Sequence, residues 1–201
     1  MHARRLSPFP KYIRDVGVVM DLATHELDIM WYLMNSEIQR IFAETRQNIH
    51  EKHEDMLLGI LNFENGVIGV LDINWLTPTK VRELWVTGEA GLFHVDYISQ
   101  DLFFYENSES SERWDAMALF RGVGEGNVLK YKINKEEPMA AELRDFVRVV
   151  QSGGTPTITG TDGLRALGLA QLLIQSARER SVIGVDEESI EQGWSEILLE
   201  K

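Results

Sequence analysis

The apolar and polar positions along the chain predict one long amphipathic helix near the N-terminus and further helices near the C-terminus. Residues 15–34 carry apolar side chains at spacings of three and four, the period of a helix with one buried face. Asp15 is the expected N-cap, because its carboxylate can accept from the free N–H groups of a first turn. The same spacing predicts helices at 138–151 and 162–180, and an acidic, weakly amphipathic tail helix at 186–201.

Between these helices the pattern indicates β-structure. Short runs rich in β-branched and aromatic residues recur between turn-forming dipeptides. Asn65-Gly66 joins two of them and is typical of a tight hairpin with positive φ at both turn residues. The predicted strands are 2–6, 38–47, 56–63, 67–75, 81–87, 91–97, 101–106, 127–134 and 181–185. We therefore expect an α+β domain: an open, mostly antiparallel sheet of about seven to nine strands with helices packed on one face.

Two of these strands suggest that the sheet is covered on both sides. The runs 56–63 and 67–75 are apolar nearly throughout, which is typical of strands buried on both faces. The helices account for one face only. A second copy of the chain is the expected cover for the other, so the sequence predicts a homo-oligomer formed through the sheet. Residues 107–125 show no clear pattern, and no role is assigned to them.

Composition limits the kinds of function. The chain has 201 residues, of which 44% are hydrophobic and 26% charged, and a formal net charge of −12. Such an acidic chain is a poor binder of nucleic acid or of anionic lipid. It contains no cysteine, which excludes disulfides, thiolate catalysis and Cys-ligated metal. No apolar run approaches the roughly 18 residues that span a membrane, and no secretory signal is visible. A cytoplasmic protein is therefore expected.

The candidate chemistry lies on the first helix. Asp21, His25 and Asp28 follow at i, i+4 and i+7, which places them on one side of that helix. A carboxylate one turn from an imidazole can form an acid/base pair whose proton affinity depends on burial. Such a pair is most often a surface pair worth a few tenths of a kcal/mol, and a histidine on an apolar face is more often a packed core residue than a catalyst. Spacing alone leaves these interpretations open.

Other candidate motifs are weaker. His50 and His53, with acidic neighbours, have a spacing that could bind metal. The stretch 50–55 is very polar and lies between two strands, so a solvated hairpin loop is expected and no metal site is predicted. The glycines at 122–126 lead into a strand and do not suggest a phosphate cradle. The sequence contains no G-x-G-x-x-G before a helix and no Walker A motif.

Several motifs together resemble one family. The run DLATHELD at 21–28 resembles the D-x-x-x-H-D-[IL]-D signature of the Gfo/Idh/MocA NAD(P)-dependent sugar and polyol dehydrogenases. Residues 137–146 and 160–167 are similar to the family's E-P-x-x-x-E-x-x-x-F and G-x-D-G-L-x-A-L endings. Residues 4–18 look like the members that act on UDP-N-acetyl-aminosugars. Glu26 stands where the family usually has Asp, which leaves the two candidate catalytic residues unaffected.

The resemblance implies roles for individual residues. His25 would accept the proton of a sugar hydroxyl as hydride leaves, and Asp21 would hold that hydroxyl or orient the base. Arg5, Lys11 and Arg14 would form a basic mouth for a phosphate or diphosphate. Asp28 is a further substrate-binding candidate with a lesser role.

It also implies an architecture. Residues 1–185 resemble the C-terminal half of the family, which binds substrate and oligomerises, and 186–201 follow as the tail helix. NAD or NADP is the implied cofactor, yet the sequence holds neither the glycine fingerprint nor the family's Glu-Lys-Pro lysine, so no cofactor-binding residue is assigned. The chain should therefore serve a dehydrogenase of sugars or UDP-sugars together with a separate or missing Rossmann domain, and be inactive alone. The alternative is a non-catalytic, free-standing paralogue that acts as a binding or oligomeric assembly module.

Overall fold

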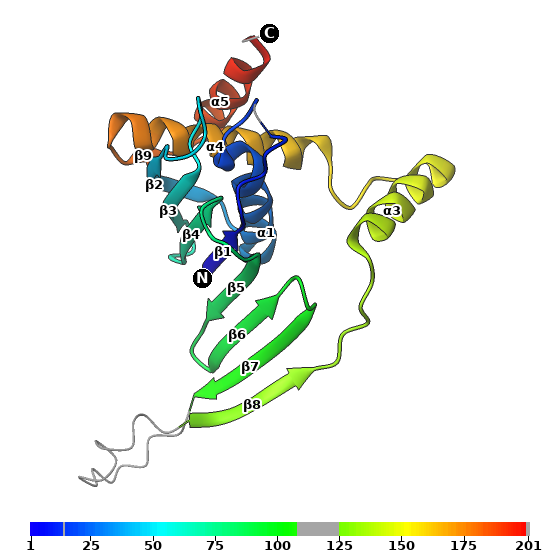
Figure 1. Cartoon of the computed structure of the whole chain (residues 1–201). Coiled ribbons are helices and arrows are strands. Elements are labelled where there is room, and N and C mark those ends of the chain that lie inside the picture. Colours follow the sequence, from blue (N-terminus) through cyan, green and yellow to red (C-terminus); the bar gives the residue numbers. More distant parts are fainter. Residues whose placement is uncertain (14, 108–124, 200–201) are drawn as a thin grey trace, which may run out of the picture.

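The computed structural model describes residues 1–13, 15–107 and 125–199 (Figure 1). Arg14, predicted to bind substrate, and nearly all of the segment 107–125 lie outside the described residues. The described residues form a sheet of nine strands in the order β8-β7-β6-β5-β1-β4-β3-β2-β9. Strands β1 and β4 pair in parallel, and the other described pairs are antiparallel. The predicted α+β sheet is thus confirmed.

The strands lie close to the predicted ranges. They are β1 (His2–Leu6), β2 (Ile38–Arg46), β3 (Met56–Phe63), β4 (Ile68–Asn74), β5 (Val81–Thr87), β6 (Gly91–Asp96), β7 (Asp101–Asn107), β8 (Glu125–Tyr131) and β9 (Ile183–Gly184). The turn between β3 and β4 differs from the expectation. Gly66 alone has a positive φ, of 83°, and its N–H donates to the Phe63 carbonyl at 3.0 Å. Four residues, 64–67, thus separate the two strands and only their glycine is left-handed, so the prediction of positive φ at Asn65 is wrong.

Most helices lie on one side of the sheet, and one stands apart from it (Figure 1). They are η1 (Val19–Ala23, a π-helical turn), α1 (Thr24–Met34), α3 (Pro138–Ser152), α4 (Gly160–Glu179) and α5 (Glu187–Leu199). Helices α1 and α4 pack on one face of the sheet, and α5 packs against α4. Helix α3 departs from the prediction of helices on one face: it stands away from the sheet and has no buried residue.

The core lies between α1, α4 and the middle of the sheet. Its fully buried members include Leu27, Met30, Leu57, Leu61, Leu71, Ile73, Leu169 and Leu173. The strands alternate in burial, since Leu57 and Leu61 are buried while Leu58 and Ile60 between them are 45% and 43% exposed. We call the side away from the helices the open face. Among the described residues, the expectation that both faces are covered is not met.

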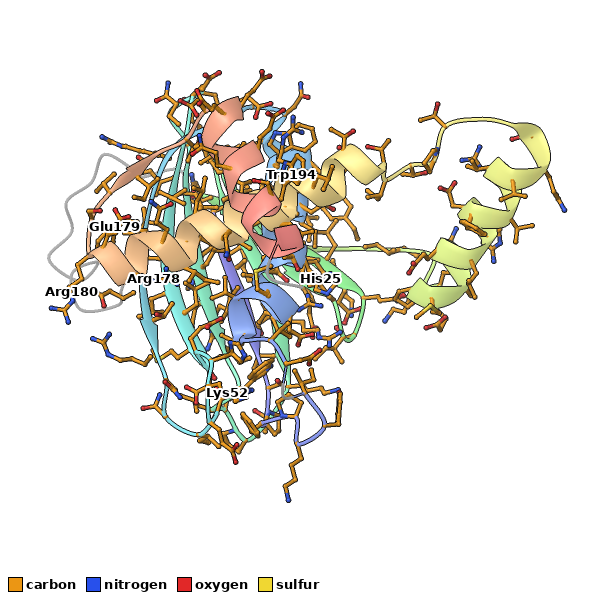
Figure 2. All side chains as sticks on the ribbon, turned by 90° about the horizontal axis from the view of Figure 1, so that it is seen from above. His25, Lys52, Arg178, Glu179, Arg180 and Trp194 are labelled. Atoms are coloured by element: carbon orange, nitrogen blue, oxygen red, sulfur yellow. The ribbon has the colours of Figure 1, made fainter. Side chains whose placement is uncertain are left out.

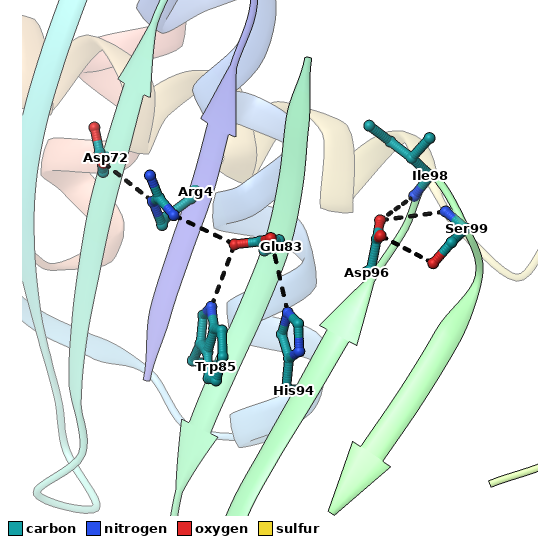
Figure 3. Close-up of polar contacts among 8 residues, drawn as sticks. All are labelled: Arg4, Asp72, Glu83, Trp85, His94, Asp96, Ile98 and Ser99. Carbon is teal, nitrogen blue, oxygen red and sulfur yellow. Dashed lines mark hydrogen bonds and ion pairs between the residues drawn. The ribbon is translucent and has the colours of Figure 1, made fainter. Parts of the chain in front are cut away.

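The open face is partly charged. Arg4 on β1 contacts Asp72 at 3.5 Å and Glu83 at 3.4 Å (Figure 3). The Trp85 indole N–H donates to Glu83 at 3.5 Å, and the Trp85 ring stacks on His94 with 3.8 Å between centroids. A polar and aromatic network thus lies beside the apolar residues of β3 and β4.

Candidate functional site

The helix that carries Asp21 and His25 begins in contact with the loop before β3, which is far from it in the sequence. The Val18 N–H donates to the Glu54 carbonyl at 2.9 Å, and the Val19 N–H donates to the Glu54 carboxylate at 3.1 Å. A Cβ on Gly17 would lie 2.0 Å from that carboxylate, so glycine allows the close approach. The predicted cap at Asp15 is wrong, because the helix starts later and Glu54 supplies the accepting oxygen.

The loop that supplies Glu54 is itself well ordered. The buried Asp55 carboxylate accepts from the consecutive backbone N–H groups of 48–50, at 2.8 Å from Asn48 and 3.0 Å from His50. Burial works against the ionised form, but these hydrogen bonds outweigh it and hold the pKa of Asp55 below its ordinary value. His50 is only 6% exposed and its ring stacks on Trp75. The prediction of a solvated loop is therefore wrong at these two residues: the loop is a fixed support for the helix start.

Asp21 and His25 lie where the helix changes from the π to the α form. Asp21 belongs to η1 and is half-buried, while His25, in the first turn of α1, remains exposed on part of its surface. Burial raises the pKa of Asp21. The surrounding protein, followed by the charge of Arg5, lowers the pKa of His25, and the Asp21 charge opposes this shift. The two groups are therefore electrostatically coupled, and His25 is held mainly in its neutral form at pH 7.

His25, labelled in Figure 2, is one of the residues that line a groove between α1 and α4. The groove has a volume of about 410 Å³, and Asp28, Ile158 and Asp162 also line it. Burial and then the Asp162 charge raise the pKa of Asp28. Asp21 is not among the lining residues, so a single pocket shared by Asp21 and His25 stays a prediction.

Arg5 lies in a buried ion pair and not, as was predicted, at the rim of a basic substrate site. Its Nη1 donates to the Glu26 carboxylate at 2.7 Å, and the two side chains are 12% and 0% exposed. Burial raises the pKa of Glu26, and Arg5 opposes that shift. Lys11 lines a separate hollow with Phe9 and His50. The structure thus does not gather Arg5 and Lys11 at one rim, and it makes Glu26 the buried partner of Arg5.

Two further residues lie beside Arg5 and were not predicted from the sequence. Arg82 on β5 lies directly opposite Arg5 on β1. Tyr97, which follows β6, donates its backbone N–H to the Arg82 carbonyl at 2.9 Å. Strand pairing brings these residues under the first helix. The apolar pattern within one strand does not predict which residues of another strand lie opposite it.

In the part of the chain that the structure describes, no three histidine, aspartate or glutamate side chains gather as a metal site would require. None of the helices there is both long and apolar enough to cross a membrane.

Comparison with known proteins agrees with this architecture. Residues 3–94 match the family model described as GFO/IDH/MocA C-terminal domain. Myo-inositol 2-dehydrogenase from Thermotoga maritima is 24% identical over 88% of this chain and 52% of its own length. UDP-N-acetylglucosamine 3-dehydrogenase from Acidithiobacillus ferrooxidans is 24% identical over 85% of this chain and 51% of its own length. The chain therefore spans about half the length of the curated relatives that it matches.

Solved structures show the same fold. UDP-N-acetylglucosamine 3-dehydrogenase from Acidithiobacillus ferrooxidans superposes with a TM-score of 0.76 at 21% identity, covering 89% of this chain and 54% of that one. Levoglucosan dehydrogenase in complex with NADH gives a TM-score of 0.73 at 18% identity, covering 92% of this chain and 57% of that one. The fold is that of oxidoreductases that include sugar dehydrogenases. Within that fold, residues 3–94 are the part that matches the GFO/IDH/MocA C-terminal domain model.

Proposed function

We propose that this chain is the substrate-binding half of a cytoplasmic NAD(P)-dependent dehydrogenase of sugars or nucleotide sugars. The observation that carries the proposal is the solvent-accessible, mainly neutral His25 on a groove, coupled to the half-buried Asp21 in a domain of this family. The names of the relatives support sugars and polyols as the substrate class.

The chemistry assigned to this chain is proton transfer. A nicotinamide held by another domain would accept the hydride from the sugar carbon. His25 takes the hydroxyl proton at an imidazole nitrogen while the carbon–oxygen bond becomes a carbonyl. Asp21 stabilises the imidazolium that results, because its charge already favours the protonated ring. A mainly neutral imidazole is the state that this role requires at pH 7.

Helix α3 indicates where the second domain would dock. Its apolar stripe is solvent-exposed, with Leu143 56%, Phe146 66% and Val150 68% exposed. A helix of 15 residues is marginal in water without a packed face. The sequence lacks a dinucleotide fingerprint, and a relative is solved with NADH. A dinucleotide-binding domain is therefore the proposed cover for α3.

Calorimetric titration of the purified chain tests the proposal. UDP-N-acetylglucosamine or myo-inositol should bind weakly to the chain, and binding should tighten when a dinucleotide-binding domain is added, since a closed cleft needs both. NADH and NADPH should not bind tightly to the chain alone, because the fingerprint that holds their diphosphate does not occur in it. Tight binding of either dinucleotide, or no binding of any sugar to the chain with or without that domain, would contradict the proposal.

An assembly role is the second candidate, and the open face favours it. Leu58, Ile60 and Ile68 on β3 and β4 are 45%, 43% and 53% exposed and form neighbouring rows. Adjacent apolar side chains of this kind mark an interaction surface. We propose that a second copy of the chain covers them, which is compatible with either function.

A further inference from the structure

Two arginines face each other beneath the first helix. Arg5 on β1 and Arg82 on β5 are direct cross-strand partners, so their Cβ atoms lie about 4.5–5.5 Å apart. Both point to the helix side of the sheet, because Arg5 reaches Glu26 of α1 and the buried Leu84 lies two residues beyond Arg82. Like charges in such positions destabilise a sheet unless other groups compensate them.

Among the residues that the structure describes, Arg5 has a close acidic partner and Arg82 has none. Arg5 pairs with the buried Glu26 at 2.7 Å. Among the described residues, no carboxylate lies within 4.0 Å of the Arg82 guanidinium, and its side chain makes no hydrogen bond there. Burial and then the charge of Arg5 lower the pKa of Arg82, yet a guanidinium stays protonated in proteins. A positive charge without a close partner therefore remains beside Asp21 and His25.

Buried polar atoms around this pair also lack partners. Within the described structure they are Arg5 Nε, Glu26 Oε2 and the Tyr97 hydroxyl oxygen. Tyr97 lies close enough for Glu26 and Arg5 to affect it: burial first, and then Glu26, raise its pKa. Buried groups of this kind normally bind a protein atom, a water or a ligand. The Tyr97 hydroxyl, on a residue whose backbone bonds to Arg82, is thus a buried donor available to a group bound at that arginine.

We propose that Arg82 binds an anionic group of the substrate, a phosphate or a carboxylate, beside His25, with the Tyr97 hydroxyl donating to the same group. Arg5 and Glu26 form a buried ion pair with each other and do not hold the anion themselves. This assignment rests on the proposed function and identifies the residues that would recognise a negative charge on the substrate. It places the anion subsite on β5, away from the hollow lined by Lys11.

The charges around His25 determine what anion binding does to the imidazole. Arg5 and Arg82 face it from the sheet, Asp21 from η1, and Asp28 and Asp162 share its groove. An anion on Arg82 would offset a positive charge and so raise the pKa of His25. Removal of the Arg82 charge would raise the same pKa in the free chain.

An NMR titration of the His25 imidazole in the full chain tests the proposal, with inorganic pyrophosphate as the probe. Pyrophosphate should bind the wild-type chain at millimolar concentration and raise the pKa of His25. Arg82→Gln should weaken binding about 10- to 100-fold, as for a lost charge-assisted hydrogen bond, and raise the pKa without the probe. Arg40→Gln, which removes an exposed arginine of β2, should change neither.

A second variant guards against loss of folding in Arg82→Gln. Arg82→Lys keeps the charge but loses the bidentate fork, so it should bind pyrophosphate more weakly while the pKa of His25 in the free chain stays near that of wild type. No binding to the wild-type chain, or equal binding to Arg82→Gln or Arg82→Lys, would overturn the proposal. Binding of neutral N-acetylglucosamine or myo-inositol without pyrophosphate binding would overturn this subsite alone and leave the proposed function standing.

Discussion

Removing Glu26, the partner of Arg5 on β1, should destabilise the chain far more than removing Asp72, which pairs with Arg4 on the opposite face of β1. Glu26 is fully buried and its partner Arg5 is 12% exposed, so Glu26→Ala leaves a nearly buried guanidinium without its counter-charge. Breaking a buried ion pair in this way costs about 3–5 kcal/mol. The control is Asp72→Ala, because the Arg4–Asp72 pair is 3.5 Å long with side chains 37% and 25% exposed. Such a pair contributes about 0.2–1 kcal/mol.

Urea unfolding followed by circular dichroism measures the difference. With a urea dependence of about 2 kcal/mol/M, Glu26→Ala should lower the midpoint by about 1.5–2.5 M, and Asp72→Ala by no more than about 0.5 M. Replacing both partners, Arg5→Met with Glu26→Leu, should recover most of the loss, since no uncompensated charge then remains. Equal midpoints for Glu26→Ala and Asp72→Ala would refute the reasoning that burial gives this pair its importance.

Three further changes test other parts of the structure. The free energy of unfolding should fall as the pH drops below about 6.5, because the pKa of His25 is lower in the folded chain than in the unfolded chain, which therefore binds the proton first. His25→Asn should reduce the dependence of this free energy on pH, and an unchanged dependence would contradict the lowered pKa. Glu54→Ala should cost about 0.5–2 kcal/mol in chemical denaturation through the lost cap, whereas no loss would mean that water replaces the carboxylate. Ile60→Lys should shift sedimentation from oligomer to monomer, with Ile49→Lys in an exposed loop as the control; a wild-type chain that is monomeric at micromolar concentration would refute self-association through the open face.

Local pattern was enough to predict the strands and the helix that became α3, but not the start of the first helix. The strand at 56–63 was predicted with its observed ends, because a run of apolar residues between turn signals sets both boundaries. The helix of 138–151 was predicted to within one residue, since Pro138 suits a first turn and Gly153 adopts the left-handed conformation that ends it. These signals lie within a few residues of the element that they define.

The surroundings of the site depend on contacts that local pattern does not encode. The carboxylate that caps Val19 comes from Glu54, and Arg82 meets Arg5 only through the register of β1 and β5. Glu26 looked like a small departure from a motif, yet it is the buried partner of Arg5. The stripe on α3 was predicted correctly, but periodicity cannot tell whether the body that it packs against belongs to the same domain.

The most direct test of the central claim is a titration of the isotope-labelled chain with UDP-N-acetylglucosamine, followed through the imidazole resonances of its histidines. The account predicts a saturable shift of the His25 ring, while the buried His50 in the supporting loop stays unchanged. Saturation of the chain with ligand while the His25 resonances do not move would contradict the assignment of this groove as the substrate site.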